Sequence, residues 1–290
     1  DIGGTTSDVG LITHAHIRES LIDVCLCPAP EGGGVSTSFR MPDVLSIGLG
    51  GGSIVRGFAG DAGLDVYAAA PPDTRRVSIG PDSVGHRLTT DSVLAGGTIC
   101  TWTDIAAAAG VLPADSVAAI GDATRLGFLP PSLICEATSA ALAALQAAID
   151  RSRLDDVTRP VVVVGGGAAL LPAGTRFLGC GDVIVPAQHA GCANALGAAL
   201  SQAGGRFDAV LPLLDGQTHE QRMALATAAA VDAAVANGAV RSSVRVVESD
   251  VVPLAYIPGG AARIRVHAVG DVDWAASASI GAWSQHALLP

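Results

Sequence analysis

Lysine is missing from the sequence: all 17 basic residues are arginine, in a chain of 290 residues with a net charge of −10. No basic tract exists to neutralise a phosphate backbone, which argues against a nucleic-acid partner. A P-loop is excluded as well, because its GxxxxGK pattern requires lysine. If the chain binds a nucleotide, it does so through a different kind of loop.

Charge of both signs is scarce, since charged residues make up 15% of the sequence while 36 residues are glycine. This composition predicts a globular protein rich in small residues and turns. The alanine-rich stretches are interrupted by Asp, Gln or Arg before they reach the roughly 18 apolar residues of a membrane span. We therefore expect no membrane partner and no signal peptide. The six cysteines are scattered along the chain, which predicts reduced thiols in a cytoplasmic protein.

The first part of the chain predicts an α/β layer. Alternating residues over 1–27 predict a hairpin that turns near 15–18, and the Gly- and Pro-rich stretch at about 28–103 predicts an insertion made mostly of loops. Two helices follow, at 104–112 with Asp104 as N-cap and at 132–152. Next come a four-valine strand, a strand in "CGDVIVP", and a helix ended by Gly204 and Gly205.

The last part of the chain changes in character after residue 206. A helix near 218–237 precedes two Val- and Arg-rich strands at 240–249 and 262–271. We predict two domains, an α/β domain over 1–206 and a small α+β extension over 207–290.

Three glycine clusters are candidates for a phosphate site: "DIGGTTSD" at 1–8, "GLGGGS" at 48–53 and "GGGA" at 165–168. Glycine allows consecutive backbone N–H groups to converge on an anion. In the first cluster, Thr5, Thr6 and Ser7 can donate to phosphate oxygens, while Asp1 or Asp8 holds Mg²⁺ through water. Ordinary tight turns are the alternative. A Rossmann fingerprint does not fit, because "GLGGGS" leads into another strand-like run rather than a helix.

Other chemistry-bearing residues are open to two interpretations. "HAH" at 14–16 and "CLC" at 25–27 form a zinc-like set, but alternating residues on an exposed strand explain them too. Asp82, Ser83 and His86 line either a substrate pocket or a solvated loop. His189 lies near a helix N-terminus, where it either caps the helix or approaches a nucleotide.

The motifs taken in order resemble the hydantoinase/oxoprolinase family, and in particular its hydantoinase A-like members. They are "DIGGTTSDVGLI", "MPDVLSIGLGGGSIVR", "GPDSVGHRL", "LAGGTICTWTDIAAAAG", "VVVVGGGAALLP" and "HAGCANALGAAL". The resemblance implies an actin-like (ribonuclease H-like) ATPase fold, in which two related halves close on ATP. It also implies ATP-dependent opening of a cyclic amide such as hydantoin or 5-oxoproline, with the γ-phosphate trapping the amide oxygen.

Site residues follow from the resemblance position by position. It implies ATP and Mg²⁺ as cofactors, with Asp1 and Asp8 as catalytic residues and Asp1 holding Mg²⁺ through water. The implied nucleotide-binding residues are Gly3, Gly4, Thr5, Thr6, Gly50, Gly51, Gly52, Ser53, Gly165, Gly166, Gly167 and Asn194.

Family members have two "DxGGT" loops, and the loop at 1–5 matches the second. We therefore expect this chain to be the second half of the ATPase fold, with the missing N-terminal half and a hydantoinase B-like subunit as partners. Two alternatives stay open: a non-catalytic nucleotide-binding or regulatory module, and an ATPase subunit of a carboxylase or activator system.

Overall fold

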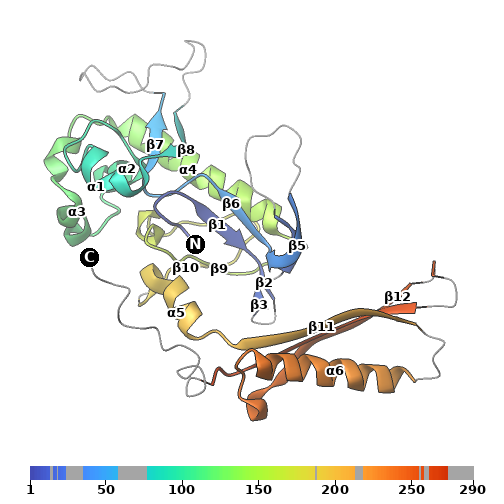
Figure 1. Cartoon of the computed structure of the whole chain (residues 1–290). Coiled ribbons are helices and arrows are strands. Elements are labelled where there is room, and N and C mark those ends of the chain that lie inside the picture. The colour runs from blue at the N-terminus through green and yellow to red at the C-terminus, as the bar shows by residue number, and fades with distance from the viewer. Residues whose placement is uncertain are drawn as a thin grey trace. The chain divides into compact units, whose positions relative to one another are not determined.

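The computed structural model describes residues 1–13, 16–17, 19–23, 35–57, 77–186, 188–212, 218–254, 256–257 and 261–273 (Figure 1). The chain divides into two compact units, Asp1–Asn194 and Ala195–Pro290. The boundary predicted at residue 206 falls inside a strand of the second unit, so that unit begins earlier in the chain than we expected.

Short antiparallel strand pairs begin the first unit. β1 (Ser7–Gly10) pairs with β6 (Val44–Ile47), with Ser7 opposite Ile47. β2 (Ile12–Thr13) pairs with β3 (His16–Ile17), so the predicted hairpin exists, but His16 and Ile17, which we expected in its turn, lie on a strand.

The stretch predicted as mostly loops contains more regular structure than expected. β4 (Glu19–Asp23) pairs with β5 (Val35–Pro42), and β7 (Ser53–Arg56) pairs with β8 (Ser78–Ser83). Both pairs contain a register shift, which interrupts the alternation that would reveal a strand in sequence. The short helices η1 (Gly85–Arg87) and α1 (Leu88–Asp91) follow.

Helix α2 (Trp102–Ala108) begins earlier than predicted, and its N-cap is Thr101 rather than Asp104. Asp104 is the N3 residue of a capping box: its Oδ2 accepts from Thr101 N at 2.7 Å, and Thr101 Oγ1 accepts from Asp104 N at 3.3 Å. Both residues are fully buried, so the box also anchors α2 in the core. α3 (Ala114–Ile120) and η2 (Ala123–Leu126) come next.

Helix α4 (Pro131–Ser152) matches the predicted long helix and starts with proline at its first position. Its buried residues recur every four positions at Leu133, Ala137, Ala141 and Leu145, and they belong to the core of the first unit. Contrary to the expectation from sequence, α4 is long and apolar enough to cross a membrane by length and composition, although a third of the relevant window is buried within the fold.

The predicted valine strand is short in the structure. β9 (Val161–Val162) runs parallel to β10 (Val183–Ile184) and leads through the buried Val163 to the third glycine cluster. The short helix η3 (Ala168–Leu170) lies between the two strands in the chain, and η4 (Ala190–Cys192) and α5 (Ala193–Ala199) follow β10.

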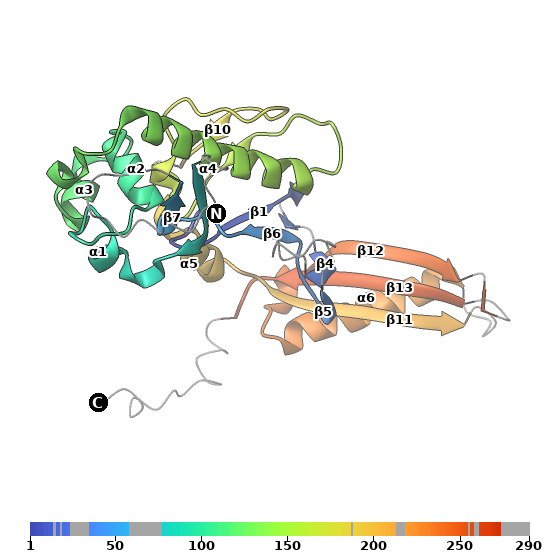
Figure 2. The ribbon, with the colours of Figure 1, turned by 90° about the horizontal axis from the view of Figure 1, so that it is seen from above.

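The second unit is a three-stranded antiparallel sheet with one helix on it (Figure 2). β13 (Ala261–Gly270) lies between β11 (Ala203–Pro212) and β12 (Arg245–Leu254), and α6 (His219–Ala236) packs on the sheet. The short helix η5 (Arg241–Ser243) precedes β12.

Gly204 and Gly205 do not stop a helix, as the sequence had suggested, but lie at the start of β11. A Cβ on Gly205 would be 2.1 Å from Ala234 N in α6, so glycine is required there by the close approach of helix and strand. Ala226, Ala230 and Ala234 are fully buried on the facing side of α6, where small side chains allow that approach.

Candidate functional site

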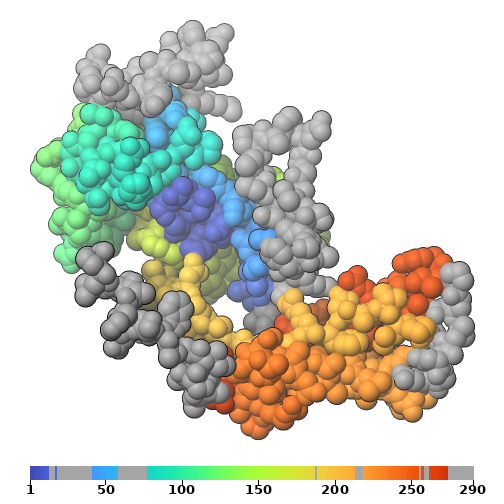
Figure 3. Space-filling model, viewed as in Figure 1, coloured from blue at the N-terminus to red at the C-terminus, as the bar shows by residue number. Residues whose placement is uncertain are grey.

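The first eight residues form a tight hairpin. Ile2 bridges Ser7, Gly3 N donates to Thr6 O at 2.8 Å, and Asp8 N donates to Asp1 O at 2.8 Å. Ile2 and Ser7 are buried, whereas Gly4, Thr5 and Thr6 at the tip are exposed. Figure 3 shows the start of the chain, in dark blue, at the surface of the first unit. The hairpin therefore presents one glycine and two hydroxyls to solvent, as a phosphate loop requires.

The second glycine cluster lies directly behind this hairpin. Gly51 N donates to Gly3 O at 3.0 Å, and Gly52 N donates to Gly4 O at 2.7 Å. A Cβ on Gly50 would be 2.6 Å from Thr5 N, so the two loops touch backbone to backbone.

The four predicted ligand residues of this cluster, Gly50, Gly51, Gly52 and Ser53, are all buried. Gly50 N donates to Ser53 Oγ at 2.8 Å, so the cluster's amide groups bond within the protein. The structure thus places these residues as support for the hairpin rather than at its exposed tip.

Helix α2 supports the second cluster in turn. Thr103 donates to Gly51 O through both its N, at 3.0 Å, and its Oγ1, at 2.8 Å. Ser7, which we expected to donate to phosphate, is instead buried, and its Oγ donates to Leu49 O at 2.6 Å. Nothing in the sequence pattern indicated this contact between Thr103 and Gly51, which is 52 residues away.

The third glycine cluster meets the same hairpin from its other side. Gly167 N donates to Ile2 O at 2.7 Å, and Gly165 N donates to Ala190 O at 2.8 Å. Gly165 has a φ of 92°, and a Cβ there would be 2.2 Å from Asp1 Oδ1. Gly166 is exposed, and no atom lies within 4 Å of its Cβ position, so it leaves room for a ligand.

Two carboxylates lie beside the hairpin. Asp1 Oδ2 accepts from Asn194 Nδ2 at 2.7 Å, which brings the predicted Asn194 to the site from α5. Asp8 accepts from Ser46 Oγ, a partner that the sequence did not suggest. Because Asp8 lies opposite both Asp1 and Ser46 across paired strands, the three side chains share one face.

These carboxylates fit the way proteins hold Mg²⁺, which uses one or two carboxylates, several waters and the substrate phosphates. A site made from protein ligands alone is not supported, because the described ranges contain no group of three His, Cys, Asp or Glu side chains placed to hold a metal ion. For the predicted zinc set, His14, Cys25 and Cys27 lie outside the residues that the structure describes.

The end of β8 and the turn that follows it also border the hairpin. Ser83 Oγ lies 3.4 Å from Gly4 O, to which it donates, and a Cβ on Gly85 would be 3.9 Å from Thr5 Oγ1. Asp82 pairs instead with Arg56 at 2.6 Å, and His86 is exposed. Asp82 and Ser83 thus lie on β8 rather than in a loop, and of these three candidates the structure brings Ser83 to the site.

Comparison with known proteins gives one family match. Residues 1–126 match the model of the hydantoinase/oxoprolinase family, which confirms the resemblance over that part of the chain. A search of curated proteins found no match.

Among solved structures, the chain is similar to an ATP-dependent caprolactamase from Pseudomonas jessenii, with a TM-score of 0.55 and 14% identity. The similarity covers 93% of this chain and 45% of the caprolactamase chain, so our sequence spans less than half of that protein's length. At this identity the comparison concerns the fold alone, which both proteins share as a mixed α/β architecture.

Proposed function

We propose, from the premise that residues 1–126 are a hydantoinase/oxoprolinase-family segment, that this chain supplies one phosphate-binding half of an ATP-dependent hydrolase of cyclic amides. The finer parts of the proposal are an actin-like arrangement of the fold, Mg²⁺ as the metal, and a hydantoin- or 5-oxoproline-type substrate. The remaining half of the site would come from another polypeptide segment or a partner subunit.

The observation that carries the proposal is the meeting of three distant glycine clusters at one hairpin. Gly51 and Gly52 bond to the carbonyls of Gly3 and Gly4, and Gly167 bonds to Ile2. Tight turns with no shared role would have no reason to contact one another. Here they hold a short exposed loop from two sides, which prepares its polar groups for a ligand before binding.

The residues of the hairpin have distinct roles in this proposal. The Thr5 and Thr6 hydroxyls and the backbone at Gly4 bind phosphate oxygens at the exposed tip. Asp1, oriented by Asn194, and Asp8, oriented by Ser46, hold the water shell of a magnesium ion. ATP, when bound, would supply the γ-phosphoryl group for transfer to the amide oxygen, which would make the ring carbon electrophilic toward water. The chain's own contribution is positioning and charge stabilisation, which dominate phosphoryl transfer.

The test is ATP hydrolysis by the complete protein, with and without hydantoin, 5-oxoproline or caprolactam. We expect one of these amides to stimulate hydrolysis and to be opened in proportion to the ADP formed. Turnover independent of every cyclic amide would favour an ATPase subunit of an activator system. ATP binding without turnover would favour a regulatory module.

Two variants with matched controls assign the site. Thr5→Val should weaken ATP binding by about tenfold, the value of one lost hydrogen bond to a charged group, while Thr89→Val on exposed α1 should not. Asp1→Asn should raise the Mg²⁺ concentration needed for turnover, while Asp115→Asn on α3 should leave it unchanged. Equal behaviour of site and control variants would place the nucleotide elsewhere.

A further inference from the structure

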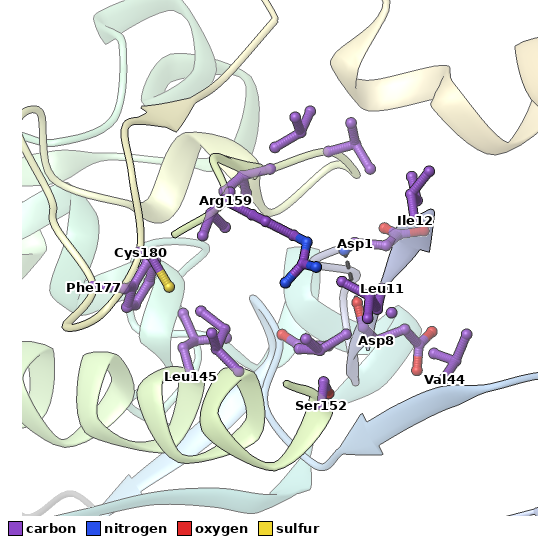
Figure 4. Close-up of a pocket in the computed structure, with 18 of the residues that line it drawn as sticks. Asp1, Asp8, Leu11, Ile12, Val44, Leu145, Ser152, Arg159, Phe177 and Cys180 are labelled. Atoms are coloured by element: carbon purple, nitrogen blue, oxygen red, sulfur yellow. Dashed lines mark hydrogen bonds between the residues drawn. The ribbon is translucent and has the colours of Figure 1, made fainter. Parts of the chain in front are cut away.

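The second unit, Ala195–Pro290, contains none of the residues that we assign to the nucleotide site. Those residues lie in the first unit, where Asp1, Asp8 and Asn194 line a cavity of about 810 Å³ (Figure 4). The proposed function therefore leaves the three-stranded sheet of the second unit without a role.

The two outer strands of this sheet differ in how well they could accept another strand. The pairing of β12 with β13 contains a register shift between Val246 and Glu248, and β12 contains Pro253, which has no N–H to donate. β11 pairs with β13 over ten consecutive residues without a shift, and its proline, Pro212, is its last residue. No strand among the described residues pairs with the outer edge of β11. A regular edge strand of this kind is a template for pairing with another chain.

Two exposed charges of opposite sign lie next to each other on one face of β11. Arg206 and Asp208 are two residues apart, so their side chains project from the same face of the strand. Arg263 orients the Asp208 carboxylate, because its Nε and Nη2 donate to the two carboxylate oxygens at 2.7 and 2.8 Å. A carboxylate accepts more than two hydrogen bonds, so Asp208 can bind a second guanidinium as well.

These two charges select one register for pairing β11 with a second copy of itself. When two copies run antiparallel with Phe207 opposite Phe207, Arg206 of each copy lies opposite Asp208 of the other copy. Moving the centre of the pair to Asp208 or to Arg206 would place two like charges directly opposite each other, which is destabilising. The charges therefore favour the register centred on Phe207.

Helix α6 brings a second contact to the same edge, because it packs mainly on β11 and β13 rather than on β12. Met223 and Val231 pack against the core of the unit. Leu225 and Ala229 lie on the opposite flank of the helix, toward the outer edge of β11, and Leu225 is 58% exposed. In a paired sheet, two α6 axes set between β11 and β13 are two strand spacings apart, or about 10 Å, which is the distance between two packed helices.

We propose that the outer edge of β11 is the interface between two copies of this chain. The two strands pair antiparallel about Phe207 and join the two sheets into one sheet of six strands, in the order β12, β13, β11, β11, β13, β12. Leu225 and Ala229 of one α6 helix pack against the α6 helix of the other copy. The partner is a second copy rather than an unrelated chain, because one face of β11 carries both members of the two ion pairs.

Charge exchange tests this interface in the complete protein, with the dissociation constant of the dimer measured by sedimentation equilibrium. Arg206→Asp places two carboxylates opposite each other at both ion pairs, and Asp208→Arg places two guanidinium groups there. Each variant alone should dimerise about 10- to 100-fold more weakly than the unsubstituted protein. An equimolar mixture of the two variants should dimerise as tightly as the unsubstituted protein, because each guanidinium again lies opposite a carboxylate.

Asp250→Arg on β12 is the matched control. Asp208 and Asp250 are both exposed and lie opposite the same residue of β13, Arg265, one on each side. The control should leave the dissociation constant unchanged, and a control that weakens the dimer as much as Asp208→Arg would overturn the proposal. A monomeric complete protein, single variants that dimerise normally, or a mixture that does not regain dimerisation would each overturn it as well.

Amide hydrogen exchange gives a readout that needs no variant. Exchange within Gly205–Ala209 should become slower as the concentration of the complete protein rises, whereas exchange in β12 should not. A dimer in which exchange in β11 is independent of concentration would refute the proposal, because another surface would then form the contact. None of these results depends on whether the first unit binds ATP.

Discussion

Replacing Gly50 by alanine tests the central feature of the site, the backbone contact between the second glycine cluster and the hairpin. The added Cβ would lie 2.6 Å from Thr5 N and 2.7 Å from Gly3 O, whereas ordinary van der Waals contact begins at 3.4 Å. These are backbone atoms, so no side chain can rotate away. Because Gly50 is buried, the hairpin has to move outward by roughly 0.8 Å to make room for the Cβ. Overpacking of this kind lowers the free energy of unfolding by about 1–3 kcal/mol.

The same displacement carries Thr5 and Thr6 away from their positions. A misplacement of about 1 Å costs roughly 100-fold in rate when positioning dominates catalysis, so we expect a loss of that order in kcat/KM for ATP hydrolysis by the complete protein. In thermal unfolding, Tm should fall by about 2–4 °C for each kcal/mol lost from the free energy of unfolding. Gly197→Ala is the control, because no atom lies within 4 Å of its Cβ position. A Gly50→Ala protein with unchanged Tm and turnover would refute the argument that the cluster positions the hairpin.

Three further predictions concern stability. Asp104→Ala removes the carboxylate that accepts from the buried N–H groups of Leu94 and Thr101 at 2.7 Å. The free energy of unfolding, measured with urea, should fall by about 3 kcal/mol, and a fall below about 1 kcal/mol would contradict this account. The Arg159 guanidinium lowers the pKa of Asp155 to about 2, so the stabilisation from this pair is present above the ordinary carboxyl pKa and is lost as pH falls toward about 2. An NMR titration of the Asp155 carboxyl should show this lowered pKa. An ordinary carboxyl pKa would show that the pair with Arg159 does not stabilise the fold. Gly205→Ala should lower the Tm of the second unit more than Gly204→Ala, since its Cβ would lie 2.1 Å from helix backbone rather than 3.2 Å from a His267 side-chain atom; equal effects would contradict the predicted clash.

Elements with strong local signals could be predicted from sequence. The four-residue spacing of Leu133, Ala137 and Ala141 defined α4, and the first hairpin was visible as alternation. The capping of α2 was wrong by three residues, because Thr101 and Asp104 both suit a helix start and only the reciprocal bonds decide between them. The strands of the loop-rich stretch were missed because register shifts break their alternation.

For the candidate site too, local sequence motifs were predictive, whereas contacts between distant segments were not. Glycine-rich loops with adjacent hydroxyls and acids indicated, from sequence alone, which segments form the candidate site and the class of ligand that we propose for it. The tertiary structure alone decided that Gly4, Thr5 and Thr6 are exposed, that Gly50–Gly52 are buried behind them, and that Asn194 and Ser46 orient the two carboxylates. The physical reason is that a glycine in an exposed turn and a glycine packed against a distant backbone cannot be distinguished in the sequence. Only packing between segments far apart in the chain distinguishes a residue that faces a ligand from one that holds the loop in place.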